Sequence, residues 1–269
     1  MSVSSYTALP PSPRGKQLLE KLSKNKLRQL LSFTKKKVRY EQNLFLAEGN
    51  KLVRDLLPYF HCKTIVGTED FYEKEEIRLE NDCYIASKEE LERLSLTRSP
   101  QAVWALFERK EENLDLSGLK EKLSLALDGV QDPGNLGTII RIADWFGIEN
   151  IICSNNCVDL YNPKVVQATM GAIARVKIHY TDLVKLIDSV EDLPIYGTFL
   201  EGEIIYETTL SSNGIIVMGN EGNGISEAVK QRITQKLFIP NYPEGSTTSE
   251  SLNVAIATAI TCAEFRRKG

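Results

Sequence analysis

A short apolar segment followed by turn residues and a helix start is the feature that most constrains this chain. Residues 123–127 read Leu-Ser-Leu-Ala-Leu, which is an apolar run of the length expected for a buried strand. Asp132 and Pro133 then favour a turn and a helix start, and Gly147 is a typical helix stop. The pattern predicts a strand, a loop and one helix, in other words a βα unit.

The expected helix has one apolar and one polar face. A period of 3.6 residues places Gly137, Arg141 and Asp144 opposite the apolar stripe. Arg141 is therefore excluded from the core, and it is either a solvated arginine, as most charged side chains are, or a functional one. The apolar stripe comprises Leu136, Ile139, Ile140, Ala143 and Phe146.

A glycine-rich loop follows a second apolar segment, Gly214–Met218. It reads Gly219-Asn220-Glu221-Gly222-Asn223-Gly224, and its glycines let backbone amides approach a ligand without an intervening Cβ. The earlier glycines, Gly129 to Gly137, lack the spacing of a dinucleotide-binding fingerprint, and no Lys-Ser/Thr pair follows the second loop as in a P-loop. The pattern indicates a binding loop of another kind.

The last segment predicts a further strand and a helix. Residues 236–240 read as a short strand, and a helix is expected from about Ser249 to Lys268. Thr247 and Glu250 have the spacing of a capping box, and the closing basic residues suit a helix C-terminus. The expected buried stripe comprises Leu252, Ile256, Ala259, Ile260 and Ala263.

Three motifs occur in order, each after an apolar segment. They are Asn135-x-Gly137-x-x-x-Arg141, the loop Gly219–Gly224, and Ile239-Pro240 followed by Ser251-Leu252-Asn253-Val254. Together they resemble the motifs of the SpoU, or TrmH-like, RNA ribose 2′-O-methyltransferases of the SPOUT superfamily. Asn162–Val166 and Thr169–Ala172 are similar to a further segment of this family. The resemblance extends over about residues 123–267.

The resemblance implies a parallel-sheet α/β domain whose C-terminal segment threads through a loop as a trefoil knot, an exception to the rule that connections do not thread. It implies S-adenosylmethionine as the cofactor, bound in the knot by Gly219, Ile239 and Leu252, with Leu200 as a further contact. The implied catalytic residues are Asn135, Arg141, Glu221, Ser251 and Asn253.

The chain departs from the family's pattern in two places. Asn241 to Glu250 forms a longer polar loop between the Ile-Pro pair and Ser-Leu-Asn, which would change how the cofactor is covered. Gln167 stands where many relatives carry an arginine, so the resemblance does not imply a substrate contact by that side chain.

Methyl transfer to a ribose hydroxyl is an in-line displacement that requires positioned reactants and an oriented or deprotonated nucleophile, and it requires no metal. A guanidinium is essentially always protonated and offers only donors, so we expect Arg141 to position the hydroxyl or a neighbouring phosphate. Asn135, Ser251 and Asn253 would share this orienting role. Glu221 either pairs with an arginine or is a solvated loop carboxylate.

The N-terminal part combines helical periodicity from Leu18 to Leu57 with a dense run of lysines and arginines. The net charge of −3 hides this asymmetry, and local positive charge is what attracts phosphates. The run is either a solvated helix face or an RNA contact that orients without reading sequence. The candidate RNA contacts are Lys35, Lys36, Lys37 and Arg39.

Residues Lys26 to Gly49 and Thr97 to Gln101 resemble the substrate-binding domain that precedes the catalytic domain in many SpoU-type rRNA enzymes. Apolar segments at 64–67, 83–86 and 102–107 fit its strands. We expect a small α/β RNA substrate-binding domain over residues 1–108, with about the first 14 flexible. A charged linker over 109–122 and the SPOUT domain over 123–269 would follow.

Composition argues against other classes of protein. With 42% hydrophobic and 26% charged residues, the chain has the composition of an ordinary soluble protein. Its length of 269 residues suits two domains. It has neither a membrane-length apolar run nor a signal peptide, so we expect a cytoplasmic protein. The scattered cysteines favour reduced thiols, and Cys153 and Cys157 have no histidine near them, which argues against a metal site. The scarcity of histidine argues against a hydrolase.

These observations favour an S-adenosylmethionine-dependent RNA ribose 2′-O-methyltransferase. Ribosomal RNA is preferred to transfer RNA because of the added substrate domain. A non-catalytic RNA-binding protein of the same fold is an alternative against which the intact motifs argue, and the basic run argues against a small-molecule nucleotide enzyme. Apolar residues on more than one face of the last helix predict a homodimer through the C-terminal domain.

Overall fold

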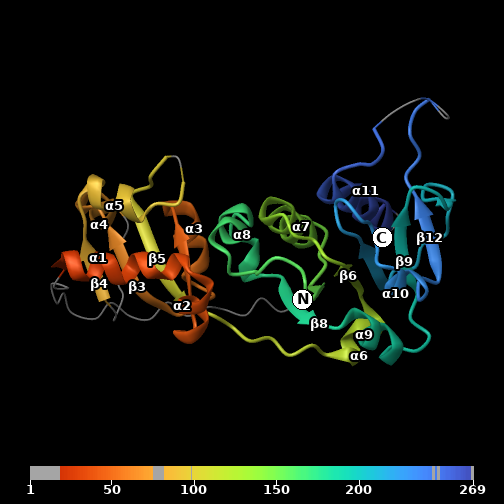
Figure 1. Cartoon of the computed structure of the whole chain (residues 1–269), viewed down its shortest axis with the longest axis horizontal. Coiled ribbons are helices and arrows are strands. Elements are labelled where there is room, and N and C mark those ends of the chain that lie inside the picture. The colour runs from red at the N-terminus through yellow and green to blue at the C-terminus, as the bar shows by residue number, and fades with distance from the viewer. Residues whose placement is uncertain (1–18, 75–81, 98, 244–245, 247–248, 268–269) are drawn as a thin grey trace.

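The computed structural model describes residues 19–74, 82–97, 99–243, 246 and 249–267. The molecule is elongated, with one β-sheet towards each end (Figure 1). We call residues 20–108 the N-terminal lobe and residues 116–266 the C-terminal lobe. The segment predicted to be flexible, residues 1–14, lies outside the described residues, as does Thr247 of the predicted capping box.

The N-terminal lobe contains a five-stranded sheet in the order β1-β4-β3-β5-β2, in which β5 is antiparallel to both of its neighbours. The central strands are buried on both faces because helices cover both sides. The elements are β1 (Glu20–Lys21), α1 (Lys24–Leu31), η1 (Ser32–Thr34), α2 (Lys36–Glu41), β2 (Leu44–Glu48), α3 (Asn50–Leu56), β3 (Cys62–Gly67), α4 (Glu69–Lys74), β4 (Asp82–Ile85), α5 (Lys88–Leu94) and β5 (Val103–Glu108).

The strands predicted at 64–67, 83–86 and 102–107 are confirmed as β3, β4 and β5. The helical periodicity predicted from Leu18 to Leu57 is wrong in part, because β2 interrupts it between α2 and α3. All five residues of β2 are buried. A strand buried on both faces is a continuous apolar run, and periodicity alone does not separate such a run from a helix.

The C-terminal lobe contains a seven-stranded sheet in the order β10-β12-β9-β11-β6-β7-β8, and every pair in it is parallel, as the α/β prediction requires. The elements are α6 (Leu116–Glu121), β6 (Leu123–Leu127), α7 (Pro133–Trp145), β7 (Asn150–Ser154), α8 (Pro163–Ala168), η2 (Ala172–Ala174), β8 (Lys177–Thr181), α9 (Leu183–Ser189), β9 (Ile195–Phe199), β10 (Glu203–Ile204), β11 (Gly214–Met218), α10 (Glu227–Lys230), β12 (Gln235–Phe238) and α11 (Val254–Arg266).

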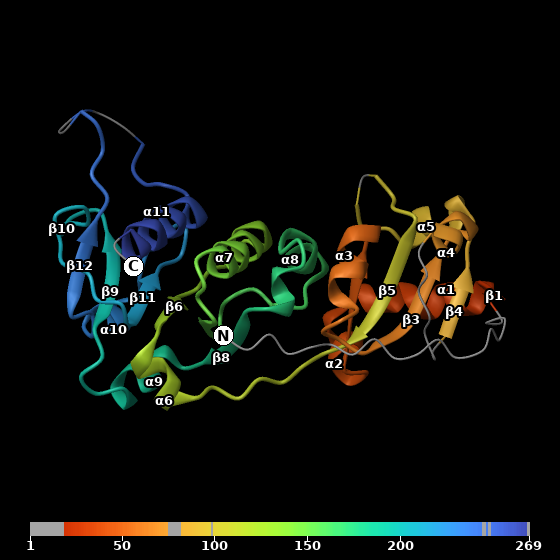
Figure 2. The ribbon, with the colours of Figure 1, turned by 180° about the vertical axis from the view of Figure 1, so that it is seen from behind.

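Helices cover both faces of this parallel sheet, as the views from the front and from behind show (Figures 1 and 2). Leu125 and Leu127 of β6 belong to the core cluster formed with α7, α8 and α11. Ala126, between them, belongs to the cluster formed with α6, α9 and α10. This alternation is expected because successive side chains of a strand point to opposite faces.

Helix α7 begins and ends as its sequence predicts. The Asp132 side chain accepts a hydrogen bond from the Asn135 amide at 2.8 Å, Pro133 occupies the first turn, and Gly147 follows with a φ of +64°. The sequence pattern placed Gly137 on the polar face of α7, and this prediction is wrong. Gly137 is buried against α8. A Cβ at Gly137 would lie 2.4 Å from the Cβ of Ala168, so this helix contact requires glycine.

Helix α11 starts later than predicted and buries a different face. Its N-cap is Asn253, whose Oδ1 accepts from the Ala255 amide at 2.9 Å, so the helix start predicted near Ser249 is wrong. Ile256, from the predicted stripe, is 52% exposed. The buried residues are Val254, Ala255, Thr258, Thr261, Cys262 and Phe265. Both faces of this segment are apolar, so the sequence pattern did not discriminate between them.

The two lobes are in direct contact. Helix α8 packs on β2, and one hydrophobic cluster contains Phe45 and Phe60 of the N-terminal lobe together with Tyr161 and Val165 of the C-terminal lobe. The predicted linker is shorter than expected, because α6 forms within it and buries Leu119. Residues 109–115 alone connect the lobes without helix or strand.

Candidate active site at the carboxyl edge of the parallel sheet

The predicted site residues follow the carboxyl ends of four neighbouring strands. Leu200 follows β9, Gly219 follows β11, and Ile239 follows β12, whereas Asn135 comes after the loop that leaves β6. Because all four strands are parallel, these positions lie along one edge of the sheet. Ligand sites of open α/β sheets lie outside the carboxyl ends of the strands.

Three of the predicted catalytic residues form a chain of hydrogen bonds. The Asn253 Nδ2 group donates to Asn135 Oδ1 at 2.9 Å, and Asn135 Nδ2 donates to Glu221 Oε1 at 2.9 Å. These residues come from the starts of α11 and α7 and from the glycine loop. The structure thus connects side chains from all three motifs. Glu221 is exposed, as a loop carboxylate would be, and within the described residues it pairs with Asn135 and not with an arginine.

The glycine loop is held by its own side chains and backbone. Asn220 Oδ1 accepts from the amides of Gly222 and Asn223, and Asn220 Nδ2 donates to the Gly129 carbonyl at 2.7 Å. A Cβ on Gly219 would lie 2.3 Å from the Gly224 carbonyl carbon, so the return of the loop itself requires glycine at 219. Asn220 was not singled out from the sequence, although an asparagine beside glycines is a typical organiser of a turn.

Arg141 and Ser251 lie outside this network. Both are exposed, and Arg141 makes no ion pair within the described part of the chain. Arg141 lies six residues after Asn135 on one helix, which separates them by about 9 Å along the axis and about 120° around it. The Arg141 side chain is therefore available to a substrate or to another chain.

The predicted cofactor contacts offer apolar surface beside backbone. The side chains of Leu200 and Leu252 are large and apolar, yet these residues are 69% and 47% exposed. Ile239 is partly buried at the end of β12, next to β9 and its follower Leu200. Exposed apolar residues beside a Cβ-free backbone at Gly219 fit the mixed apolar and polar surface of S-adenosylmethionine.

The predicted RNA contacts divide into two groups. Lys35, Lys36 and Lys37 are exposed, at and just inside the start of α2. Arg39 is only 2% exposed and pairs with Asp159 of the C-terminal lobe at 2.9 Å, so the prediction that it contacts RNA is wrong. The burial of one arginine within a run of exposed lysines cannot be recognised in the sequence, because it depends on Asp159, which lies 120 positions away.

A cavity of about 260 Å³ lies between the lobes, and Gln167 is part of its lining. Glu48 is buried beside it and accepts hydrogen bonds from Ser95 Oγ at 2.5 Å and from the Leu96 amide at 3.1 Å. Glu48 thereby anchors the segment that leads into the motif at 97–101. The cavity is lined by Leu46, Glu48, Leu96, Thr97, Pro163, Lys164, Gln167 and Ala168.

Other site types find no support in the described residues. Within them, no group of three or more His, Cys, Asp or Glu side chains is placed to hold a metal ion. All five cysteines lie in described segments, and no disulfide joins any two of them. No helix in the part of the chain that the structure describes is long and apolar enough to cross a membrane.

Comparison with known proteins agrees with this geometry. Residues 122–263 match the model of the SpoU rRNA Methylase family, and this stretch includes all three motifs. The chain belongs to the SpoU rRNA methylase family. Residues 24–105 match a second model, the MRM3-like substrate binding domain, which falls within the N-terminal lobe.

Three similar proteins align with nearly the whole chain. The 23S rRNA (guanosine(2553)-2′-O)-methyltransferase RlmP of Bacillus subtilis is 30% identical over 90% of this chain and 96% of its own length. A TrmH-family protein from Porphyromonas gingivalis has a solved structure that superposes with a TM-score of 0.82, at 39% identity, over 92% of this chain and 99% of that one. The AdoMet-bound rRNA methyltransferase from Sinorhizobium meliloti superposes with a TM-score of 0.79, at 29% identity, over 93% and 97%.

Proposed function

We propose that this SpoU-family protein transfers a methyl group from S-adenosylmethionine to the ribose 2′-oxygen of a nucleotide in ribosomal RNA. The observation that carries the proposal is the chain of hydrogen bonds from Asn253 through Asn135 to Glu221 at the carboxyl edge of the sheet. The activity named for RlmP and the match to a substrate-binding domain support ribosomal RNA as the substrate. RlmP is a bacterial enzyme, and ribosomal RNA of bacteria is made and modified in the cytoplasm, so we expect this protein to act there.

The site residues have distinct chemical roles in this proposal. S-adenosylmethionine supplies an activated methyl group when it is bound. Asn135 is held at both ends of its amide, so its orientation is set before the substrate arrives. Glu221 is the one member of the network able to accept the hydroxyl proton, since amides are not bases. Arg141, a permanent donor, would hold the ribose or a phosphate, and Ser251 would contribute a hydroxyl beside Leu252.

We also propose that the C-terminal lobe carries a trefoil knot. After β12, at one side of the sheet, the chain returns so that α11 packs on α7. Arg266 Nε donates to the Phe146 carbonyl at 2.9 Å, and the rings of Phe265 and Tyr196 lie 4.8 Å apart. A return of the C-terminal segment from β12 to α7 favours its passage through a loop of the same lobe, which would form the knot. An experimental backbone trace from residue 195 to residue 266 tests it.

A homodimer through α7 and α11 is the third part of the proposal. Trp145 of α7 is 86% exposed and Ile256 of α11 is 52% exposed, and these two helices pack together. Leu252, just before α11, is 47% exposed. Exposed apolar side chains on adjacent helices favour a two-fold interface. We expect light scattering to give a dimer for the full chain and a folded monomer for Ile256→Glu. A native monomer at micromolar concentration would contradict this part.

The decisive test of the activity uses the full chain with labelled S-adenosylmethionine. Large-subunit RNA from cells lacking the gene is the first substrate, with transfer RNA in parallel, and nuclease digestion with mass spectrometry locates the methylated ribose. We expect methylation of ribosomal RNA by the native protein and none by Glu221→Gln, which should still bind S-adenosylmethionine. Methylation of transfer RNA alone would change the substrate, and RNA binding without any transfer would favour a non-catalytic binding protein.

A further inference from the structure

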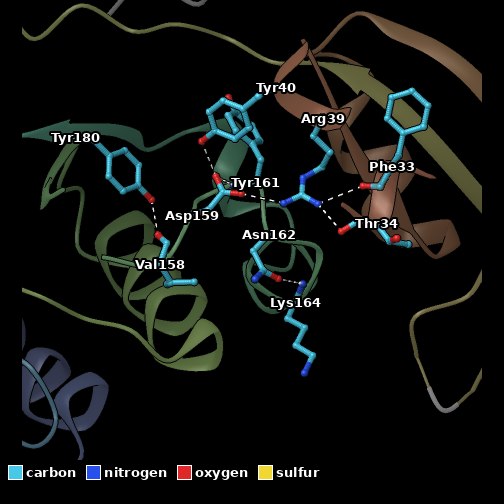
Figure 3. A network of polar contacts seen from close by, with 10 residues as sticks. All are labelled: Phe33, Thr34, Arg39, Tyr40, Val158, Asp159, Tyr161, Asn162, Lys164 and Tyr180. Atoms are coloured by element: carbon cyan, nitrogen blue, oxygen red, sulfur yellow. Dashed lines mark hydrogen bonds and ion pairs between the residues drawn. The ribbon is translucent and has the colours of Figure 1, made fainter. Parts of the chain in front are cut away.

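A buried ion pair joins the two lobes (Figure 3). Arg39 Nη2 of α2 lies 2.9 Å from Asp159 Oδ2, in the segment that follows β7, and the two side chains are only 3% and 6% exposed. Arg39 Nη1 also donates to the carbonyls of Thr34 at 2.8 Å and of Phe33 at 3.2 Å. One guanidinium therefore connects η1, α2 and the C-terminal lobe.

The second carboxylate oxygen of Asp159 is held as well. Tyr40, the next residue of α2, donates its hydroxyl to Asp159 Oδ1 at 2.8 Å, and the Tyr161 amide donates to the same oxygen at 3.2 Å. Burial and the hydrogen bond to Asp159 raise the pKa of Tyr40 to about 12, so this hydroxyl remains a donor at every physiological pH. Both oxygens of Asp159 thus have a partner from the N-terminal lobe, and Oδ1 also accepts from its own lobe.

Aromatic and cationic groups surround this contact. The Arg109 guanidinium lies 3.7 Å from the centre of the Tyr40 ring and 5.0 Å from that of Tyr161. Tyr161 in turn lies 4.9 Å from Phe45 of β2, and its hydroxyl donates to the Lys110 carbonyl at 3.1 Å. The start of the connecting segment is therefore part of the same cluster, which leaves little freedom for one lobe to turn against the other.

The energetics of burial favour one relative orientation of the lobes. Removing one partner of a buried pair is strongly destabilising, because the remaining charge is stranded without water, whereas replacing both partners with apolar residues is often neutral. Any rotation that separates Arg39 from Asp159 would strand both charges in the same way. The pair is consequently a poor source of stability but a strong determinant of geometry.

The two sides of the contact lead to the two parts of the candidate site. Arg39 lies on the helix that carries Lys36 and Lys37 and is preceded by Lys35. On the other side, the residue before Asp159, Val158, donates its amide to the Val130 carbonyl at 2.9 Å, in the loop that leads to Asn135. A short path of backbone thus separates the exposed lysines from the catalytic network.

We propose that Arg39, Tyr40 and Asp159 are positioning residues that hold the RNA-contacting lysines in one orientation relative to the catalytic network. The expected effect on RNA rests on the function proposed above. The expected effect on the orientation of the lobes does not. Arg39, expected from the sequence to touch RNA, thereby acts on RNA through the placement of its neighbours.

The test uses Arg39→Met with Asp159→Leu in one full-length variant, so that no buried charge is left unpaired. Spin labels on Glu92→Cys of α5 and Lys185→Cys of α9, in a Cys157→Ser background, report the distance between the lobes. We expect unchanged S-adenosylmethionine affinity and kcat, a broader distance distribution, and a KM for ribosomal RNA raised about tenfold. The matched control replaces the exposed pair Arg232 and Asp188 with Met and Leu, and should change none of these.

Tyr40→Phe provides a second, milder variant that keeps the ring and removes one hydrogen bond. It should broaden the distances and raise the KM in the same direction by a smaller factor. Distances as narrow as in the native protein, or an RNA KM within twofold of it, in the double variant would overturn the proposal. If the native protein methylates no RNA, the proposed function fails, while the distance measurement still decides whether this cluster sets the lobe orientation.

Discussion

Asn135 shows how much one residue contributes at this site. Its backbone amide closes the cap of α7 on Asp132, its Oδ1 accepts from Asn253, and its Nδ2 donates to Glu221. Each bond is of ordinary length, and the two side-chain bonds determine which end of the amide faces Asn253 and which faces Glu221. Pre-set orientation of this kind removes reorganisation from the reaction, which is the main way in which polar groups accelerate a displacement.

Arg141 is the residue whose role is most open to direct test. We expect Arg141→Ala to lower methyl transfer on the order of 10²-fold or more, because one positioned cationic donor is removed. The melting temperature and the affinity for S-adenosylmethionine should stay unchanged, since the side chain is exposed and supports no other residue. Single-turnover rates on the RNA substrate measure the effect, and Arg232→Ala, far along the chain in an exposed ion pair, is the control. Near-native turnover would make Arg141 a merely solvated residue.

At the scale of the element, α11 combines structural and chemical tasks at its first turn. Asn253 caps the helix through Oδ1 and reaches Asn135 through Nδ2. The helix start and the catalytic network therefore share one side chain, which explains why the chain places asparagine there when serine, threonine or aspartate would cap equally well.

The two tasks of Asn253 are separable by substitution. Asn253→Asp keeps the capping oxygen and loses the donor, whereas Asn253→Ala loses both, at a cost of about 1 kcal/mol for the cap. We expect the melting temperature to fall in Asn253→Ala only, and activity to fall about tenfold or more in both variants. Calorimetry and methylation assays measure the two effects. Full activity in Asn253→Asp would show that the bond to Asn135 has no catalytic importance.

Strand β8 introduces a pH dependence of stability. Burial lowers the pKa of His179, partly offset by its contact with the Glu112 carbonyl at 3.2 Å, and the nearby charge of Lys177 lowers it further. The unfolded state then binds a proton at higher pH than the folded state, so stability is lost as the pH falls below the unfolded value of about 6.5. Urea unfolding at pH 7.5 and 5.5 should show this loss, and His179→Gln should reduce it. An equal loss in the variant would assign the effect to other groups.

At the scale of the whole molecule, the two lobes act as one unit with a shared hydrophobic cluster and a buried ion pair between them. The exposed lysines of α2 consequently belong to a surface that is fixed relative to the catalytic edge. In a protein whose net charge is −3, such a local surface determines where a polyanion binds.

Replacing Lys35, Lys36 and Lys37 with glutamate tests this surface. We expect weaker RNA binding and a salt dependence whose slope falls by roughly one unit for each phosphate that the protein no longer neutralises, with unchanged affinity for S-adenosylmethionine. Filter binding between low and moderate salt measures the slope. The same replacement at Lys120, Lys177 and Lys185, exposed lysines of α6, β8 and α9, should leave it unchanged. Equal effects of the two triple variants would show that only net charge matters.

Features that depend on neighbouring residues could be predicted from the amino-acid sequence. The start and end of α7 and the strands β3 to β6 follow from capping chemistry and apolar runs, which act within a few positions. The roles of Asn135, Glu221 and Asn253 came from the resemblance of their motifs to a known family. The structure brings them to one edge, because carboxyl ends of parallel strands share an edge.

The remaining features depend on contacts between distant segments and became visible only in the folded chain. The burial of Arg39, the close approach at Gly137 and the buried face of α11 each depend on a partner far away in the chain. Neighbouring residues do not reveal which distant side chain an arginine among lysines will pair with. They also do not reveal which face of a helix with two apolar faces will be buried. Burial is a property of the space around a residue, and that space is known only when the distant segments that enclose it are in place.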